Sequence, residues 1–234
     1  MFEKTSHLDN KLYFQHACIP GIAFDDFLQE QVLFLDSHPW EICVVHIRYD
    51  NIPEACRKPT QEELRACFNQ ACNRANGLPP LRWGGPELLQ RSIASLRQAG
   101  TRLIVLQEAD KYDSYTHEAY ATLSAESILK QFESMTTEGQ TGPGAGDLTI
   151  LQCQATSQSI KEVLVHSVLA SNTATSCLTS TKADLDRQTL PWLRLNLNQR
   201  LKADGKLCVV LNDFIDGATT ETGVELSRER LSWA

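Results

Sequence analysis

Short apolar segments of strand length alternate along this chain with longer segments of helical periodicity. This alternation is typical of parallel β-α-β units, in which a helix returns the chain to the start of the next strand. Helices are expected at residues 24–37, 60–75, 86–98, 119–133, 157–170, 184–201 and 225–233. Strands are expected at residues 11–16, 41–48, 102–107, 148–153 and 206–211, with a weaker signal at 81–83. The sequence therefore predicts an α/β fold, either a doubly wound sheet or a TIM barrel.

Two features favour the barrel. Neither GxGxxG nor GxxxxGKS/T, the phosphate loops of nucleotide-binding sheets, occurs in the sequence. Polar residues instead end or follow the expected strands, namely His16, Arg48, Gln107, Glu108, Gln154 and Asp213. In a TIM barrel the carboxyl ends of the strands form the rim that carries the active site. We therefore expect a single TIM-barrel-type domain over residues 1–234, with a flexible loop at 136–146.

The composition excludes several classes of protein. Lys and Arg total 22 against 29 Asp and Glu, so the net charge is −7 and no basic stripe indicates a nucleic-acid surface. No apolar run approaches the ~20 residues that span a bilayer, and residues 1–10 do not resemble a secretory signal. The eight cysteines include no CxxC pair, which disfavours a metal site or a disulfide framework. The location stays open between the cytoplasm and, if upstream sequence carries a signal, secretion.

Four segments in order carry a resemblance to a known family. They are 12–16 (LYFQH), 34–47 (FLDSHPWEICVVHI), 148–156 (LTILQCQAT) and 207–214 (LCVVLNDF). The first two resemble a strand that ends in a catalytic histidine, and the helix and strand after it, in phosphatidylinositol-specific phospholipase C of the X-domain type. The third resembles the LQWxLT strand of PLC-like phosphodiesterases, and the fourth resembles the last strand of their barrel. Order and spacing match from about residue 11 to 217.

The resemblance implies a phosphoric diester hydrolase that acts on an inositol phospholipid or a related phosphodiester. In this family one histidine is the general base and a second is the general acid, while cationic side chains or a calcium ion stabilise the charge on phosphate. By position, His16 corresponds to the general acid, Asp213 to a carboxylate that orients a catalytic histidine, and Arg48 to a strand-end cation. Gln107 and Gln154 are expected to line the substrate pocket. No ligand set for calcium or another metal is visible, so no cofactor is predicted.

The matched region begins at the third β/α unit of the family's barrel. The family's first catalytic histidine and its D-x-R pair lie upstream of that region, and a closed barrel needs eight strands rather than five or six. We therefore expect a barrel that is incomplete at its N-terminal side. Its exposed edges would be residues 11–16 and 206–211, and copies of the chain could associate through them. Without the first histidine, turnover by this chain is expected to be negligible.

Alternative interpretations accompany both the function and the residues. The chain could be a catalytically inactive, truncated relative that binds a ligand or is vestigial. A glycerophosphodiester phosphodiesterase is a lesser alternative, because the early pair of acidic metal ligands is not found. His16 could be a hydrogen-bonded core histidine, Arg48 a solvated strand end, and Asp213 the N-cap of a turn.

Overall fold

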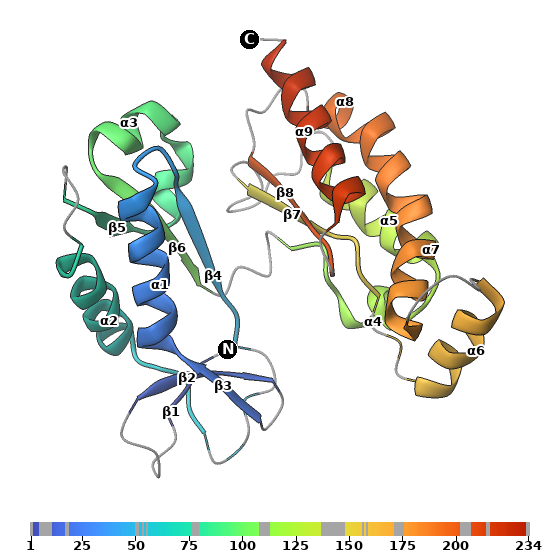
Figure 1. The fold of residues 1–234 in the computed structure, drawn as a ribbon, viewed down its shortest axis with the longest axis horizontal. Helices are drawn as coiled ribbons and strands as arrows, with labels where there is room; N and C mark the ends of the chain where they lie inside the picture. The colour runs from blue at the N-terminus through green and yellow to red at the C-terminus, as the bar shows by residue number, and fades with distance from the viewer. Residues whose placement is uncertain are drawn as a thin grey trace. The chain divides into compact units, whose positions relative to one another are not determined.

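The computed structural model describes residues 2–4, 11–16, 19–49, 52, 54, 56–75, 80–107, 113–136, 148–155, 157, 159–170, 176–201, 207–213 and 216–232. The chain divides into two compact units, Met1–Ala109 and Asp110–Ala234. We call them unit 1 and unit 2 and describe each by itself (Figure 1).

The first sheet of unit 1 is antiparallel. β1 (Phe2–Lys4), β2 (Leu12–His16) and β3 (Ile19–Ala23) pair in the order β1-β2-β3. Only two residues separate β2 from β3, whereas a parallel pair needs a crossover of a dozen or more residues. The prediction that residues 11–16 form a parallel barrel strand with an exposed edge is therefore wrong, since β2 is paired on both sides.

The second sheet of unit 1 is parallel. β4 (Cys43–Ile47), β6 (Thr101–Gln107) and β5 (Arg82–Gly84) pair in the order β4-β6-β5. β4 and β6 run in register from Cys43 opposite Leu103 to Ile47 opposite Gln107. Their carboxyl ends therefore lie level with each other.

Helices α1 (Phe24–Ser37) and α2 (Gln61–Asn73) pack into the core of unit 1. The capping box predicted for α2 is present, because the Thr60 side chain accepts from the Glu63 amide while the Glu63 carboxylate accepts from the Thr60 amide. The buried side chains that meet in this core include Phe24, Leu28, Val32, Leu35, Val45, Ile47, Leu64, Phe68, Leu103 and Val105.

The single helix predicted at 86–98 is divided in two. The 3₁₀ helix η1 (Pro86–Gln90) is followed by α3 (Ile93–Gln98), and the Ser92 side chain caps α3 by accepting from the Ser95 amide at 3.2 Å. This serine offers the backbone a new helix start, which a reading of apolar spacing alone does not detect. Gly100, expected to close the segment, has a positive φ of 69°.

Unit 2 is built around two parallel strands. β7 (Leu148–Gln152) and β8 (Leu207–Leu211) pair in register along their whole length. Its helices are α4 (His117–Tyr120), α5 (Ala125–Met135), α6 (Ile160–Ala170), α7 (Cys177–Trp192), α8 (Asn198–Arg200) and α9 (Gly217–Leu231), with the π-helical segment η3 (Leu193–Leu197) between α7 and α8. The core includes Ile128, Phe132, Leu151, Cys153, Leu185, Leu193 and Leu226.

Two helices of unit 2 begin earlier in the chain than the sequence pattern suggested. α7 begins at Cys177 rather than 184 because Ser176 and Thr179 form a capping box. α7 also passes through Pro191, the expected interruption, and widens into η3 just after it. α9 begins at Gly217 rather than 225, with Asp216 as its N-cap.

The parallel strands and the helices between them confirm the α/β class. In the described residues the strands form three separate sheets, and no closed barrel is observed. Within that part of the chain β8 pairs with β7 alone, so association through residues 206–211 stays a prediction. The predicted flexible loop lies outside the described residues from 137 onward. None of the described helices has the length and apolarity that crossing a bilayer requires.

Candidate functional site

The carboxyl end of the parallel sheet in unit 1 carries two predicted site residues. Arg48 directly follows β4, and Gln107 is the last residue of β6, opposite Ile47. Gln107 and Gln61 exchange amide hydrogen bonds of 2.8 and 3.1 Å, and the Tyr49 hydroxyl donates to Gln107 Oε1 at 3.3 Å. The Gln107 side chain is therefore fixed beside the strand end that Arg48 extends.

A groove of about 530 Å³ lies next to this edge, with Gln61 and Gln107 in its lining. Arg65 supplies a cation to the lining, and Trp83 Nε1 donates to Asn69 Oδ1 at 2.8 Å. The Arg65 guanidinium and the amide groups can donate hydrogen bonds to an oxyanion, whereas the Glu87 carboxylate in the same lining only accepts them and would repel an anion.

The carboxyl end of the parallel sheet in unit 2 carries the other two strand-end residues. Gln154 and Asp213 each lie two residues beyond the end of their strand, β7 and β8. Both line a cavity of about 40 Å³, together with Cys153 and Asn212. Burial raises the pKa of the Cys153 thiol to about 12, so this thiol is protonated at neutral pH and is not an ionised nucleophile.

A buried ion pair that sequence analysis missed lies beside this cavity. Lys182 Nζ binds the Asp186 carboxylate and, at 2.9 Å, that of Asp216. The Lys182 and Asp186 side chains are only 9% and 11% exposed. Burial alone would lower the pKa of Lys182, but the hydrogen bonds to both carboxylates outweigh it and raise that pKa. The i,i+4 spacing of Lys182 and Asp186 is the sequence signal that could have identified the pair.

Asn212 connects this ion pair to the cavity. Its Nδ2 atom donates to Asp186 Oδ1 at 2.8 Å and to Thr219 Oγ1 at 3.0 Å, which fixes the orientation of the amide. Within the described part of the chain, Asn212 Oδ1 is buried and has no hydrogen-bond partner. A cavity of this size can hold a water molecule, and a water hydrogen would satisfy Oδ1.

Gln154 is held by a second polar network. Its Nε2 atom donates to Gln152 Oε1, while Gln152 Nε2 donates to both carboxylate oxygens of Asp113 at 2.7 and 2.6 Å. Gln152 is buried at the end of β7. This hydrogen bond fixes the orientation of the Gln154 amide, which lines the cavity.

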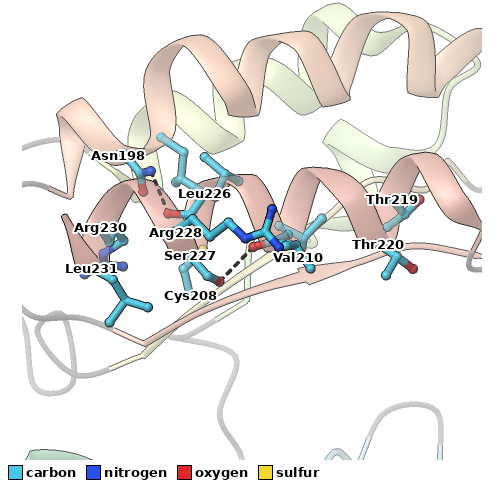
Figure 2. Close-up of a pocket in the computed structure, with 13 residues that line it drawn as sticks. Asn198, Cys208, Val210, Thr219, Thr220, Leu226, Ser227, Arg228, Arg230 and Leu231 are labelled. Atoms are coloured by element: carbon cyan, nitrogen blue, oxygen red, sulfur yellow. Dashed lines mark hydrogen bonds between the residues drawn. The ribbon is translucent and has the colours of Figure 1, made fainter.

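A third hollow, of about 490 Å³, lies between β8 and α9 (Figure 2). Its lining includes Cys208 and Val210 of β8 and Leu226 of α9. Burial raises the pKa of the Cys208 thiol to about 12. Figure 2 shows Asn198 at one end of this hollow, where its amide donates to the Leu226 carbonyl at 2.9 Å. With a mainly apolar lining and an uncharged thiol, it is not a candidate for acid–base chemistry.

The predicted catalytic residues belong to different units. His16 ends β2 in unit 1, in the antiparallel sheet, and its side chain lies outside the described part of the structure. Asp213 belongs to unit 2. Gln154 and Asp213 line one cavity at the carboxyl edge of the sheet in unit 2, whereas Arg48 and Gln107 lie at neighbouring strand ends in unit 1. The convergence of His16, Arg48 and Asp213 stays a prediction, and Glu108 lies outside the described residues.

Among the described residues, no group of three or more His, Cys, Asp or Glu side chains is arranged to hold a metal ion. Comparison with protein-family models, curated proteins and solved structures finds no match for this chain.

Proposed function

We propose that the chain binds a phosphodiester at the carboxyl edge of the parallel sheet in unit 1 and hydrolyses it in the manner of phosphatidylinositol-specific phospholipase C, at a very low rate because the family's first histidine has no counterpart in the matched region. The substrate class is an inositol phospholipid or a related phosphodiester. The observation that carries this proposal is the in-register pairing of β4 and β6, which places Arg48 and the fixed Gln107 amide at one edge. The carboxyl ends of parallel strands are where α/β proteins bind ligands.

In the proposed reaction the Arg48 guanidinium and the Gln107 amide contact the phosphate oxygens. Guanidinium suits this role because it is always charged and can donate two parallel hydrogen bonds to phosphate. A water molecule attacks phosphorus and loses a proton to solvent, the bond to the leaving oxygen breaks, and His16 gives that oxygen a proton.

A second candidate function is phosphodiester binding without turnover, as in an inactive relative. It is favoured by the position of His16, whose strand belongs to the antiparallel sheet, whereas Arg48 follows a strand of the parallel sheet. The two functions share a ligand and differ in whether His16 acts on it.

The test uses the full chain with a chromogenic inositol phosphodiester, phosphatidylinositol vesicles and glycerophosphocholine, each with and without calcium. Binding of a non-hydrolysable phosphodiester is measured by calorimetry in parallel. Turnover that His16→Ala abolishes and His38→Ala preserves would support the hydrolase; His38 is an exposed matched control at the end of α1. Binding without turnover, lost in Arg48→Ala, would support the second function. Absence of binding would contradict the role proposed for Arg48 and Gln107. Turnover that His16→Ala leaves unchanged would contradict the role proposed for His16.

A further inference from the structure

A glycine in the middle of α9 forms part of the wall of the hollow between β8 and α9. Glycine weakens the interior of a helix more than any residue except proline. A Cβ atom added at Gly223 would meet no atom within 4 Å, so no neighbour requires the side chain to be absent. The backbone there is helical, so it does not require glycine either. The effect of the missing side chain is that it leaves the hollow open.

The walls of this hollow are mainly apolar. The aliphatic and thiol side chains that form them are Leu197, Cys208, Val210, Val224, Leu226 and Leu231. Thr220 and Ser227 also line it, but their hydroxyls donate to main-chain carbonyls of α9 at 2.9 and 2.7 Å. These two hydroxyls therefore have acceptors within the helix, and the space between β8 and α9 suits hydrocarbon.

The charge of the lining is positive. Of the described residues that line the hollow, the charged ones are both cations, Arg228 and Arg230, although the whole chain has a net charge of −7. Burial raises the pKa of the Cys208 thiol to about 12, and the Arg230 charge opposes this shift, so that charge lies close to the apolar wall. Glu229 is not part of the lining, and its carboxylate accepts a hydrogen bond from Asn198 Nδ2 at 2.6 Å. The groove in unit 1 differs, because there a carboxylate accompanies the guanidinium.

We propose that the hollow between β8 and α9 binds a single-chain anionic amphiphile, a fatty carboxylate or an alkyl phosphate. The alkyl chain lies between the strand and the helix, and the anionic group binds Arg228 and Arg230. Guanidinium groups donate paired hydrogen bonds to carboxylate and phosphate alike. In Figure 2 the lining extends along α9 from Thr219 at one end to Leu231 at the other. Twelve steps of ~1.5 Å make this length about 18 Å, which accommodates an extended alkyl chain.

The shape of the site favours a small ligand over a protein surface. Small-molecule sites are concave and mainly apolar, hold a few polar groups and have volumes of roughly 300–1,000 Å³. The hollow, of about 490 Å³, has each of these properties. Its walls come from unit 2 alone, and Gly223 makes room between two elements of that unit. A missing side chain deepens such a site, whereas a protein partner is bound by side chains that project from a broad face.

The experiment is calorimetric titration of the full chain with decanoate, kept below the concentration at which it forms micelles. The test variant Gly223→Leu fills the hollow with a side chain and should weaken decanoate binding by about 10-fold or more. Leucine also favours a helix more than glycine does, so the thermal midpoint of this variant should equal or exceed that of the wild type. The matched control is Gly217→Leu at the start of α9, where an added Cβ also meets no atom within 4 Å but which does not line the hollow. It should bind decanoate as the wild type does.

A second variant tests the anionic end of the ligand. Arg228→Gln/Arg230→Gln should weaken decanoate binding by about 10-fold or more, because charge-assisted hydrogen bonds are lost. Arg74→Gln/Arg187→Gln, at two exposed arginines outside the lining, is its control and should leave binding unchanged. Decyl phosphate, titrated in the same way, shows whether the site prefers phosphate or carboxylate. Decyltrimethylammonium has the same alkyl chain with a positive charge and should not bind the hollow.

A wild type that does not bind either anion would overturn the proposal, as would a Gly223→Leu variant that binds decanoate as tightly as Gly217→Leu. Equal affinity for decanoate and decyltrimethylammonium would overturn the assignment of an anionic ligand. Light scattering that shows a wild-type dimer lost in Gly223→Leu, without decanoate binding, would make the hollow a protein interface instead. This inference goes beyond the proposed function, because it involves no phosphodiester and no residue of unit 1. Its failure is therefore distinct from failure of the phosphodiesterase proposal.

Discussion

The Nη1 atom of Arg102 donates a hydrogen bond of 2.8 Å to the main-chain oxygen of Leu35. The same atom lies 3.2 Å from the His38 carbonyl and 3.4 Å from that of Glu41. Leu35 is in the last turn of α1, whose terminal carbonyls have no partner within the helix. One buried guanidinium at the start of β6 therefore satisfies the end of α1 and the turn that leads into β4.

We expect Arg102→Met to lower the free energy of unfolding of unit 1 by about 3 kcal/mol, because buried carbonyl groups lose a charged donor. Urea denaturation followed by circular dichroism measures the change. Arg82→Met, at an exposed position of the neighbouring strand β5, is the control and should change stability by less than about 0.5 kcal/mol. If Arg102→Met lowered the free energy of unfolding no more than Arg82→Met does, the Arg102 contacts would add no stability.

The buried pair of Lys182 and Asp186 allows a comparison within one protein. Lys182→Met should destabilise unit 2 by about 3–5 kcal/mol, because it leaves the Asp186 carboxylate buried without its cation. Lys130→Met breaks an i,i+4 pair with Glu126 whose side chains are mostly exposed, and should cost less than about 0.5 kcal/mol. Lys182→Met/Asp186→Leu should recover at least half of the loss, since no buried charge is left unpaired. A double variant no more stable than Lys182→Met would contradict this explanation.

Asp216 should make stability depend on pH in the acid range. Its hydrogen bond with Lys182, followed by the one from the Thr219 backbone, lowers its pKa from 3.8 to about 2. A carboxyl group with a lowered folded-state pKa stabilises the fold above its unfolded pKa, and this contribution is lost as the pH falls toward 2. Because the side chain is 48% exposed, solvent screening reduces the contribution to about 1 kcal/mol.

The variant Asp216→Asn isolates this effect, because asparagine also caps helices well. The difference in unfolding free energy between the wild type and Asp216→Asn should be full at pH 5 and vanish near pH 2. Urea titrations at several pH values measure it. Glu221→Gln, at an exposed position of the same helix, is the control for the loss of one negative charge. A difference that stays constant from pH 5 to pH 2 would refute the assignment to Asp216.

Arg48 should carry much of the phosphodiester affinity. Loss of a charge-assisted hydrogen bond to phosphate in Arg48→Ala should raise the Kd of the proposed ligand about 10- to 100-fold, while Arg48→Lys should retain part of the affinity. Calorimetry with a non-hydrolysable phosphodiester measures both. Arg74→Ala, an exposed arginine at the end of α2, is the control. An unchanged Kd in Arg48→Ala would exclude this arginine from the site.

Local patterns in the sequence were enough to determine the α/β class, the capping box at Thr60 and Glu63, and the position of α1. They also placed Arg48 and Gln107 at strand ends. These features depend on contacts between residues a few positions apart, such as helix periodicity and the cap hydrogen bonds. A local pattern could likewise have suggested the pair of Lys182 and Asp186, but not that it is buried.

Only the tertiary structure decided which strands pair and what each side chain meets. The segment ending at His16 has the apolar character of a barrel strand, yet β1 and β3 flank it in an antiparallel sheet because the connection to β3 is too short for a crossover. The aliphatic side chains of α6, such as Val168 and Leu169, have the apolar character of a buried face, yet they are exposed, and His166 and Ser167 of the same helix contact α7 instead. Strand pairing and helix orientation arise from contacts between segments distant in sequence, whose free energies no local pattern contains.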